Sequence, residues 1–298
     1  MTVEEINTFL MVVETNSITA AANQLFISQS TASSRIYNLE KEIGVTLIYR
    51  AKGIKEISLT TEGEEFLPIA QQWLALYKDA QDLKNFHSLR TLRIVTSDLL
   101  NTQLLPYIYT DFTNKYNNIM LYTQTEHASE AYNQVANQLI DIAIVYTLHN
   151  LQNIVSYPLY KEDMVILCHK DHKFAKTQDF RDLNGDSEVY TRWSTEYEVW
   201  HKQNFPYNHR FKIVIGTASM TKHFLNEITD WAIVPKIVAN NIILEKPDFI
   251  AIEHRHIPSR TAYLLTHKYA KPGSKELIQL FIHELVGHLK KNDSVTML

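Results

Sequence analysis

The sequence predicts an α/β protein of two or three domains that starts with a helical segment. Three observations support this fold class. The chain has 298 residues, whereas one domain typically spans roughly 100–200. Apolar residues recur at helical spacing through the first sixty positions, and from Arg90 onward short apolar runs alternate with helical patterns. With 45% hydrophobic and 21% charged residues, the composition suits packed domains and excludes disordered or collagen-like chains.

Glycine and cysteine usage narrows the function classes. The seven glycines are dispersed, and the closest two, Gly44 and Gly53, are nine positions apart. Neither glycine-rich phosphate-binding motif is therefore present, which weighs against nucleotide hydrolysis and Rossmann-type redox chemistry. The single cysteine, Cys168, cannot form an internal disulfide. Because no signal segment and no run of 18 apolar residues occurs, we expect a soluble cytoplasmic protein without a membrane partner.

Three helices are predicted before Gly44. The first carries an apolar stripe at i, i+3, i+4 and i+7 within Ile6–Val13 and begins with the capping box Thr2–Glu5. Ser17 caps a short second helix rich in alanine, and Ser28 caps a third helix. Gly44 ends the third helix. Two helices joined by a short turn describe a helix-turn-helix.

The outer face of the third helix consists of short donors and acceptors with one arginine. Its candidate DNA-binding residues are Ser28, Gln29, Ser30, Thr31, Ser33, Ser34, Arg35 and Asn38. Such side chains suit hydrogen bonding to base edges. Two short extended runs follow around a basic turn, a wing whose candidate DNA-binding residues are Arg50, Lys52 and Lys55. The two lysines are expected to contact phosphates. Although the whole chain has a net charge of −4, a local basic strip can still dock on DNA because salt screens distant carboxylates. A helical domain that binds protein is the alternative.

A string of short motifs in residues 1–67 carries a family resemblance. The string comprises Phe9 with Val12 and Val13, Ser17–Ala22, Ile27–Ser30, Leu39-Glu40, Gly44-Val45, Leu59-Thr60 and Gly63. It resembles the DNA-binding domain of the bacterial LysR-type transcriptional regulators, which implies double-stranded operator DNA as a partner. The family often has proline at the position of Ser30 and a basic residue at the position of Ser34. Here the arginine is one place later, which turns it by about 100° around the helix.

The next predicted helix begins with the capping box Thr61–Glu64 and contains Pro68, where we expect a bend. Apolar residues follow at alternating spacings of four and three. They are Phe66, Ala70, Trp73, Tyr77 and Ala80. This pattern fits a dimer seam of about two heptads and fits a buried core helix equally well. The resemblance implies a linker helix that pairs subunits, and hence a homodimer or homotetramer.

The second half alternates strands with helices, which predicts a mainly parallel sheet. Expected strands are 92–96, 120–126, 141–145, 164–168, 189–191, 211–215 and 261–266, and expected helices are 103–116, 129–139, 220–227 and 275–290.

Further motifs extend the resemblance into this half. They are Leu104-Leu105-Pro106, Phe112, Asp141–Ile144 and Ile233–Pro235. They resemble the family's effector-binding domain, a two-subdomain α/β module related to periplasmic solute-binding proteins. The implied domains are 1–60 for DNA binding, 61–89 for the linker helix and 90–298 for the effector, with subdomain I at about 90–160 and 267–298 and subdomain II at about 161–266. Thr229-Asp230-Trp231 departs from a typical Gly-x-Gly.

No motif supports catalysis or a metal. In His283–His288 the second histidine lies at i+5, about 140° around a helix from the first, so the pair does not form a zinc-binding face. Cys168-His169 with His172, and His254 with His256, fall short of an assembled ligand set. We expect no enzyme activity, no cofactor and no metal.

Effector candidates follow from the rule that ligands bind beyond the carboxyl ends of strands in open α/β sheets. The residues at these ends are Ser97, Asp98, Thr147, Arg192, Trp193, Thr217 and Ser219. Arg192 would favour a carboxylate-bearing effector, with Trp193 and Trp231 as apolar walls, whereas Asp98 would pair with an amine. Serine and threonine at these places also commonly cap helices.

The resemblance implies a LysR-type transcriptional regulator in which a small-molecule effector controls DNA binding or bending. RNA polymerase would be a further partner if the protein activates transcription. The alternative is an α/β enzyme or a solute-binding module with an incidental helical N-terminal domain.

Overall fold

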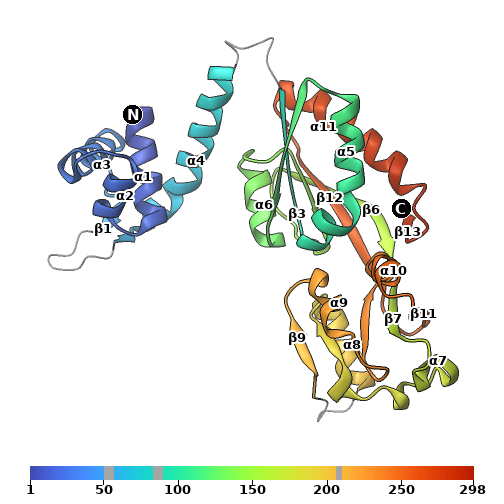
Figure 1. Cartoon of the computed structure of the whole chain (residues 1–298). Helices are drawn as coiled ribbons and strands as arrows, with labels where there is room; N and C mark the ends of the chain where they lie inside the picture. Colours follow the sequence, from blue (N-terminus) through green and yellow to red (C-terminus); the bar gives the residue numbers. More distant parts are fainter. Residues whose placement is uncertain (50–56, 83–89, 206–209) are drawn as a thin grey trace. The chain divides into compact units, whose positions relative to one another are not determined.

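The computed structural model describes residues 1–49, 57–82, 90–205 and 210–298 (Figure 1). The predicted wing residues Arg50, Lys52 and Lys55 lie outside these ranges. The chain divides into two compact units. The first contains Met1–Ser88, and the second contains Leu89–Ala136 and Ile140–Leu298. In the described ranges, no helix combines the length and apolar character needed to cross a membrane.

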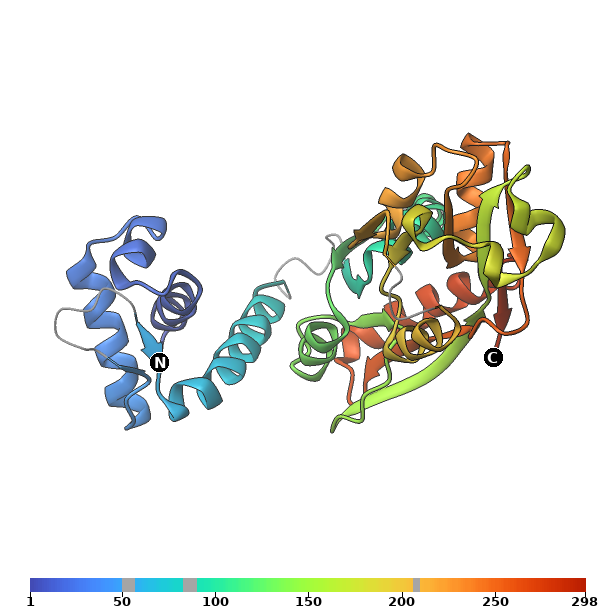
Figure 2. The same cartoon turned by 90° about the horizontal axis from the view of Figure 1, so that it is seen from below.

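The first unit is a three-helix bundle with a small antiparallel hairpin and a following helix (Figures 1 and 2). Its elements are α1 (Val3–Thr15), α2 (Ile18–Gln24), α3 (Gln29–Ile43), β1 (Ile48–Tyr49), β2 (Ser58–Leu59) and α4 (Thr61–Asp82). The predicted starts of α1, α2 and α3 are confirmed, since Thr2, Ser17 and Ser28 each accept a backbone N–H from the first turn. Gly44 ends α3 at a φ of 85°, in the left-handed region that glycine tolerates best.

The start of α4 differs from the sequence prediction. The cap is Thr60, whose Oγ1 accepts the N–H of Gly63 at 2.9 Å, so the predicted Thr61–Glu64 capping box is wrong by one residue. Thr60 is buried and also donates to the carbonyl oxygen of Thr46 at 2.7 Å, which ties the helix start to the hairpin. The helix continues through Pro68 to Asp82.

The second unit contains two lobes, each built on its own sheet. The first sheet has the strand order β13-β6-β12-β5-β3-β4. Its strands are β3 (Arg90–Thr96), β4 (Ile119–Thr125), β5 (Ile142–Val145), β6 (Ile154–Glu162), β12 (Arg260–His267) and β13 (Val295–Met297). We call residues 90–162 and 260–298 lobe I, and residues 163–259 lobe II.

Helices cover both faces of the lobe I sheet because successive strand residues point to opposite faces. Ile94 and Ile144 pack in one core with α5 (Leu105–Lys115) and α11 (Pro272–Leu289), where the rings of Phe112 and Phe281 lie 5.4 Å apart. Val95 packs in the opposite core with α6 (Ala128–Ala136). The π-helical turn η2 (Leu100–Leu104) leads into α5.

Lobe II is built on the antiparallel sheet β10-β7-β11. Its strands are β7 (Met164–His169), β8 (Val189–Thr191), β9 (Ile213–Ile215), β10 (Trp231–Pro235) and β11 (Phe249–Glu253). Its helices are α7 (Lys173–Thr177), η3 (Phe180–Asp182), η4 (Gly185–Ser187), α8 (Thr195–Asn204), η5 (Ala218–Met220), α9 (Thr221–Phe224) and α10 (Lys236–Glu245). The parallel pair β8-β9 lies beside this sheet, since Glu188 forms a bridge to Trp231.

The prediction of a mainly parallel sheet is wrong. Only β3-β4, β3-β5 and β8-β9 are parallel among the strand pairings of the described second unit, and the other five are antiparallel. The reason is topological. The chain leaves lobe I along β6 and returns along its antiparallel neighbour β12, so these strands pair with opposite direction. Because β12 begins at Arg260, the return lies at 260 rather than the expected 267.

Candidate DNA-binding surface and effector pocket

The core of the first unit fixes which face of α3 is exposed. Ala32, Ile36 and Leu39 are buried against α1 and α2, so the opposite face points to solvent. Most of the predicted DNA-binding residues are exposed there, and Ser33 is half-buried. The exposed ones are Ser28, Gln29, Ser30, Thr31, Ser34 and Asn38.

Three of the predicted hydroxyls hold the start of α3 together. The Ser28 hydroxyl accepts the N–H of Thr31 at 3.1 Å and lies 2.8 Å from the hydroxyls of Ser30 and Thr31. Gln29, Ser34 and Asn38 make no side-chain hydrogen bond within the described part of the chain. Their donors and acceptors are therefore uncommitted.

Arg35 leans toward α1 rather than outward. Its Nη1 donates to Oγ1 of the buried Thr8 at 3.4 Å, and the side chain is half-buried. The one-residue shift seen in the sequence thus places the guanidinium at the edge of the exposed face.

Two exposed aromatic residues were not among the predicted site residues. Tyr37 is 57% exposed on the polar face of α3, and Phe26 is 96% exposed in the turn before that helix. Phe26 has a φ of 55°, which is uncommon for a residue other than glycine. In the sequence, Tyr37 stands among the short polar residues of the third helix. An interpretation based on hydrogen-bonding groups alone does not select such an aromatic residue.

The base of the wing is attached to α3 by Glu40. Its Oε1 accepts the N–H groups of Leu47 at 2.9 Å and Ile48 at 3.2 Å. β1 and β2 then pair with Ile48 opposite Leu59, as predicted for a wing. The orientation of the hairpin is therefore set by a side chain of the helix that carries the polar face.

The predicted dimer seam on α4 needs correction. Phe66 and Ala70 are buried in the first unit's own core, where the ring of Phe66 lies 5.3 Å from that of Phe9. Trp73 is half-buried and stacks on Tyr77 at 5.7 Å. The exposed apolar residues are instead Ile69 and Leu76, at 55% and 53%, with Tyr77 and Ala80 also exposed. The apolar stripe open to a partner is therefore rotated from the one predicted.

A cavity of about 310 Å³ opens in the second unit. It is lined by residues from both lobes, namely 146–148, Met164, 193–197, 258–261 and Tyr263. Of the predicted effector residues, Thr147 and Trp193 line this cavity. Ser97, Asp98, Arg192, Thr217 and Ser219 do not.

Arg192 is not the cation of this cavity. Its side chain is 76% exposed and forms an ion pair with Glu198 at 2.6 Å. The cavity contains Arg260 instead, a residue that no sequence motif indicated. Arg260 donates from Nε to Oε1 of Glu162 at 2.7 Å, and its Nη2 donates to the same oxygen.

Burial governs the ionisation of the groups around Arg260. Burial, the largest single effect, lowers the pKa of Arg260, but the charge and hydrogen bond of Glu162 together with the phenols of Tyr146 and Tyr160 outweigh it and raise the pKa. Burial also raises the pKa of Tyr146, whose hydroxyl lies 2.9 Å from that of Tyr160. At neutral pH the site thus holds a charged guanidinium beside neutral phenols.

The remaining predicted residues have other surroundings. The Ser97 hydroxyl and Oδ2 of Asp98 are buried without a hydrogen-bond partner in the described structure, at the entry to the π-helical turn. The Thr217 hydroxyl lies 3.1 Å from that of Ser219. Trp231 is fully buried in the core of lobe II, so its expected role as a wall of the cleft is wrong.

The departure at Thr229-Asp230-Trp231 has a structural role. The buried Asp230 carboxylate accepts the N–H groups of Asn226 at 2.8 Å and Glu227 at 2.7 Å, and it pairs with Lys212 at 2.7 Å. Trp231 donates from Nε1 to the carbonyl oxygen of Asn184 at 2.8 Å. Side chains thereby hold the turn before β10.

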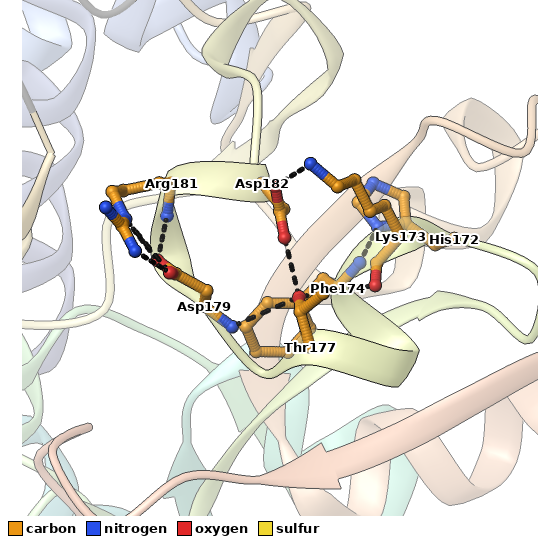
Figure 3. Close-up of polar contacts among 7 residues, drawn as sticks. All are labelled: His172, Lys173, Phe174, Thr177, Asp179, Arg181 and Asp182. Carbon is orange, nitrogen blue, oxygen red and sulfur yellow. Dashed lines mark hydrogen bonds and ion pairs between the residues drawn. The ribbon is translucent and has the colours of Figure 1, made fainter.

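Two residues of the candidate metal-ligand groups in lobe II, His172 and Cys168, serve capping and packing. His172 caps α7, because its Nδ1 accepts the N–H of Phe174 at 3.0 Å, and it adjoins a polar cluster in which Asp182 contacts Lys173 and Thr177 (Figure 3). Burial raises the pKa of the Cys168 thiol to about 11. Across the described ranges, no three metal-ligating side chains come together.

Family models match both units. A model described as bacterial regulatory helix-turn-helix protein, lysR family, matches residues 3–64, and one described as LysR substrate binding domain matches residues 87–290.

Curated relatives are similar at low identity. An uncharacterized HTH-type transcriptional regulator, YwbI of Bacillus subtilis, is 23% identical over 81% of this chain and 78% of its own length. A probable nitrogen assimilation transcriptional activator of Synechococcus elongatus is 30% identical over 59% of this chain and 58% of its own length. A probable RuBisCO transcriptional regulator of Thalassiosira pseudonana is 28% identical, and this chain likewise spans only 58% of its length.

Solved structures share the fold. A full-length OxyR variant from Pseudomonas aeruginosa has a TM-score of 0.67 at 16% identity and covers 96% of this chain and 94% of its own. CbnR, a LysR family transcriptional regulator, has in complex with its target DNA a TM-score of 0.66 at 20% identity, and the match covers 98% of this chain and 99% of its own.

Proposed function

The chain belongs to the LysR family of bacterial transcriptional regulators, and on that premise we propose which of its residues contact DNA, a second subunit and the effector. It is a DNA-binding transcriptional regulator with an effector-binding domain. The observation that carries the DNA assignment is the uncommitted polar face of α3, held outward by a buried apolar face.

Gln29, Ser34 and Asn38 contact base edges in this proposal. Their polar groups are exposed and have no partner in the described structure, and glutamine and asparagine can bond adenine through two hydrogen bonds. Ser28, Ser30 and Thr31 surround the amino end of α3, where backbone N–H groups favour a phosphate.

The cations and the exposed aromatics have separate roles. Arg35, half-buried beside Thr8, contacts the phosphate backbone, as do Arg50, Lys52 and Lys55. Phe26 and Tyr37 supply apolar contacts such as those made to the thymine methyl group.

Subunit pairing uses the stripe that α4 leaves exposed. Ile69, Trp73, Leu76 and Ala80 follow one another at spacings of four, three and four, the pattern of a coiled-coil seam. A homodimer paired along this stripe would cover apolar area that a single chain leaves in water. Phe66 and Ala70 are not part of it.

The effector binds in the cavity of the second unit, where Thr147 and Trp193 contact it. A volume of about 310 Å³ suits a small metabolite. Ser97 and Asp98 do not line this cavity, so they are not among the contacts proposed for it, although their buried oxygen atoms lack partners in the described structure. We assign the pocket a regulatory role rather than a catalytic one.

A mobility-shift experiment tests the DNA assignment. DNA from immediately upstream of the protein's own gene is compared with shuffled DNA of the same length. Asn38→Ala should weaken binding to the specific fragment by about one to two orders of magnitude, because a bidentate base contact is worth about 1–3 kcal/mol, while binding to shuffled DNA stays unchanged. Asn114→Ala, an exposed asparagine of the second unit, is the matched control. Equal loss on both DNA fragments would place Asn38 on the phosphate backbone.

A further inference from the structure

Among the described residues, Arg260 is the one arginine that lines the effector pocket. Only 9% of its side chain is exposed, so it lies well inside the protein. Both of the hydrogen bonds that it donates go to a single oxygen, Oε1 of Glu162, from Nε and Nη2. Within the described part of the chain, Nη1 of Arg260 has no hydrogen-bond acceptor. A guanidinium has five N–H donors in one plane, so the edge that carries Nη1 remains available to the cavity.

Aromatic rings from both lobes hold this guanidinium in place. Its carbon Cζ lies 3.8 Å from the ring centroid of Tyr146 in lobe I and 4.9 Å from that of Trp193 in lobe II. The indole of Trp193 is itself fixed, since its Nε1 donates to the carbonyl oxygen of Ile233 at 2.8 Å. Cation–π contact and burial therefore restrict Arg260 to one orientation before any ligand binds.

The surroundings of Arg260 favour a ligand that is negative at one end and apolar at the other. Ser194, Thr195 and Ser259 line the cavity, and α8 (Thr195–Asn204) begins within this lining, where the backbone N–H groups of a first helical turn favour an anion. The hydroxyl of Ser194 accepts one of these N–H groups, that of Tyr197. Trp193 and Tyr263 offer apolar surface. The acidic residue on the lining, Glu196, is exposed, where water and salt weaken its charge.

We propose that Arg260 binds the carboxylate of a small organic acid and that the effector of this protein is such an acid. The proposal rests on the function proposed above, since it names the ligand class of the same pocket. The acid's carboxylate accepts hydrogen bonds from the open edge of the guanidinium, and its apolar body lies against the aromatic wall. Arg260 takes the role that the sequence had suggested for Arg192.

The position of Arg260 also gives the ligand a route to the rest of the effector domain. Arg260 opens β12 and lies opposite Glu162, the last residue of β6, in the sheet register. These two strands carry the chain out of lobe I and back into it. A carboxylate bound at the open edge shares the charge of this guanidinium with Glu162, so binding of the acid weakens the ion pair that joins the two crossing strands.

The test uses the full chain and matched pairs of neutral and anionic probes: benzoate with benzamide, phenylacetate with phenylacetamide, and 3-methylbutanoate with its amide. Calorimetric titration measures affinity, and melting temperature provides a second measure because a ligand of the folded state raises it. At least one acid should bind at least about tenfold more tightly than its amide, as expected for a hydrogen bond to a charged group.

Variants at the ion pair separate this proposal from a purely structural role of Arg260. Glu162→Gln removes the competing carboxylate and should tighten acid binding by about tenfold. Replacing both residues, Glu162→Gln with Arg260→Gln, avoids leaving a buried charge alone and should abolish the preference for acids. Arg192→Gln, at an exposed arginine, is the control and should bind as wild type does.

Three results would overturn the proposal: amides that bind as well as acids, no binding by any acid, or a retained preference for acids in the double variant. Mobility shifts with upstream DNA are measured on the same samples. Specific DNA binding without acid binding would contradict only the role of Arg260. Absence of specific DNA binding would contradict the proposed function itself.

Discussion

Replacing Gly63 by alanine tests how the start of α4 packs on the wing. A Cβ at this position would lie 2.1 Å from the carbonyl oxygen of Leu47, 3.0 Å from its carbonyl carbon and 3.1 Å from Cδ2 of Leu59. The nearest of these atoms is backbone and cannot rotate away. The same carbonyl oxygen accepts the N–H of Thr60 at 3.0 Å, and the N–H of Leu47 donates to Glu40. Relief of the clash therefore has to move β1 away from α4.

The expected cost is about 3 kcal/mol, at the upper end of the usual cost of overpacking a well-packed site. Gly287→Ala is the control: it makes the same chemical change, but we expect it to raise stability rather than lower it. Gly287 lies inside α11, and a Cβ there would meet no atom within 4 Å. Alanine should stabilise this helix by about 0.5–1 kcal/mol, because glycine loses more backbone entropy in a helix than alanine does.

Amide hydrogen exchange on the full chain measures backbone protection in each unit separately. This is needed because a chain with two units need not unfold in one step. Gly63→Ala should speed exchange in α1, α2 and α3 and weaken operator binding, while peptides of the second unit keep wild-type rates. Gly287→Ala should slow exchange in α11. Unchanged protection throughout the first unit of Gly63→Ala would refute the packing argument, since the clash would then have been absorbed at no cost.

Three further predictions concern the seam, the wing and lobe II. Leu76→Glu should dissociate the proposed homodimer in sedimentation without unfolding the first unit, because Leu76 is exposed in a single chain. Gln81→Glu, at another exposed residue of α4, should leave the assembly as it is in the wild type. Lys52→Ala or Lys55→Ala should weaken binding to the specific fragment and to shuffled DNA alike, and should reduce the salt slope of binding by about 0.9 per lost phosphate contact. A loss of affinity confined to the specific fragment would contradict this role. Burial lowers the pKa of His172 below the ordinary 6.5, so the unfolded chain binds the proton more tightly. The stability of lobe II should therefore be complete above pH 6.5 and fall as the pH drops through the lowered pKa, and His172→Gln should flatten this dependence.

Local chemistry explains why the first unit could be predicted from the sequence. Caps and helix ends depend on residues within one turn of each other, as with Ser28 and Thr31 or with Gly44. The error at the start of α4 has the same local origin. Thr60 and Thr61 are adjacent and equally suited to capping, and the choice falls on Thr60 because its hydroxyl also reaches the carbonyl of Thr46 in the hairpin.

The second unit could be predicted less well because its decisive contacts are distant in sequence. Arg260 and Glu162 lie 98 positions apart, and neither belongs to a motif. β6 was missed for a related reason. It contains Pro158, and a proline usually indicates that a strand is interrupted. Its partner β12 shifts register between Ala262 and Tyr263 beside that proline. Once β6 and β12 are taken as neighbouring crossing strands, the antiparallel pairing and the place of the pocket both follow.

The two apolar stripes of α4 show why helical spacing alone misassigns a dimer seam. Phe66 and Ala70 face the core beside Phe9, whereas Ile69 and Leu76 face outward. Trp73 is half-buried and belongs to both series of positions. Since a helix has 3.6 residues per turn, spacings of three and four can be traced along either stripe, and only the packing of α1 against Phe66 shows which one is already occupied. In the proposed homodimer, a partner that contacts Trp73 would lie seven residues, about two helical turns, from Phe66, whose ring packs against Phe9 of α1. The proposed seam would thereby adjoin the helix bundle that carries the polar face of α3.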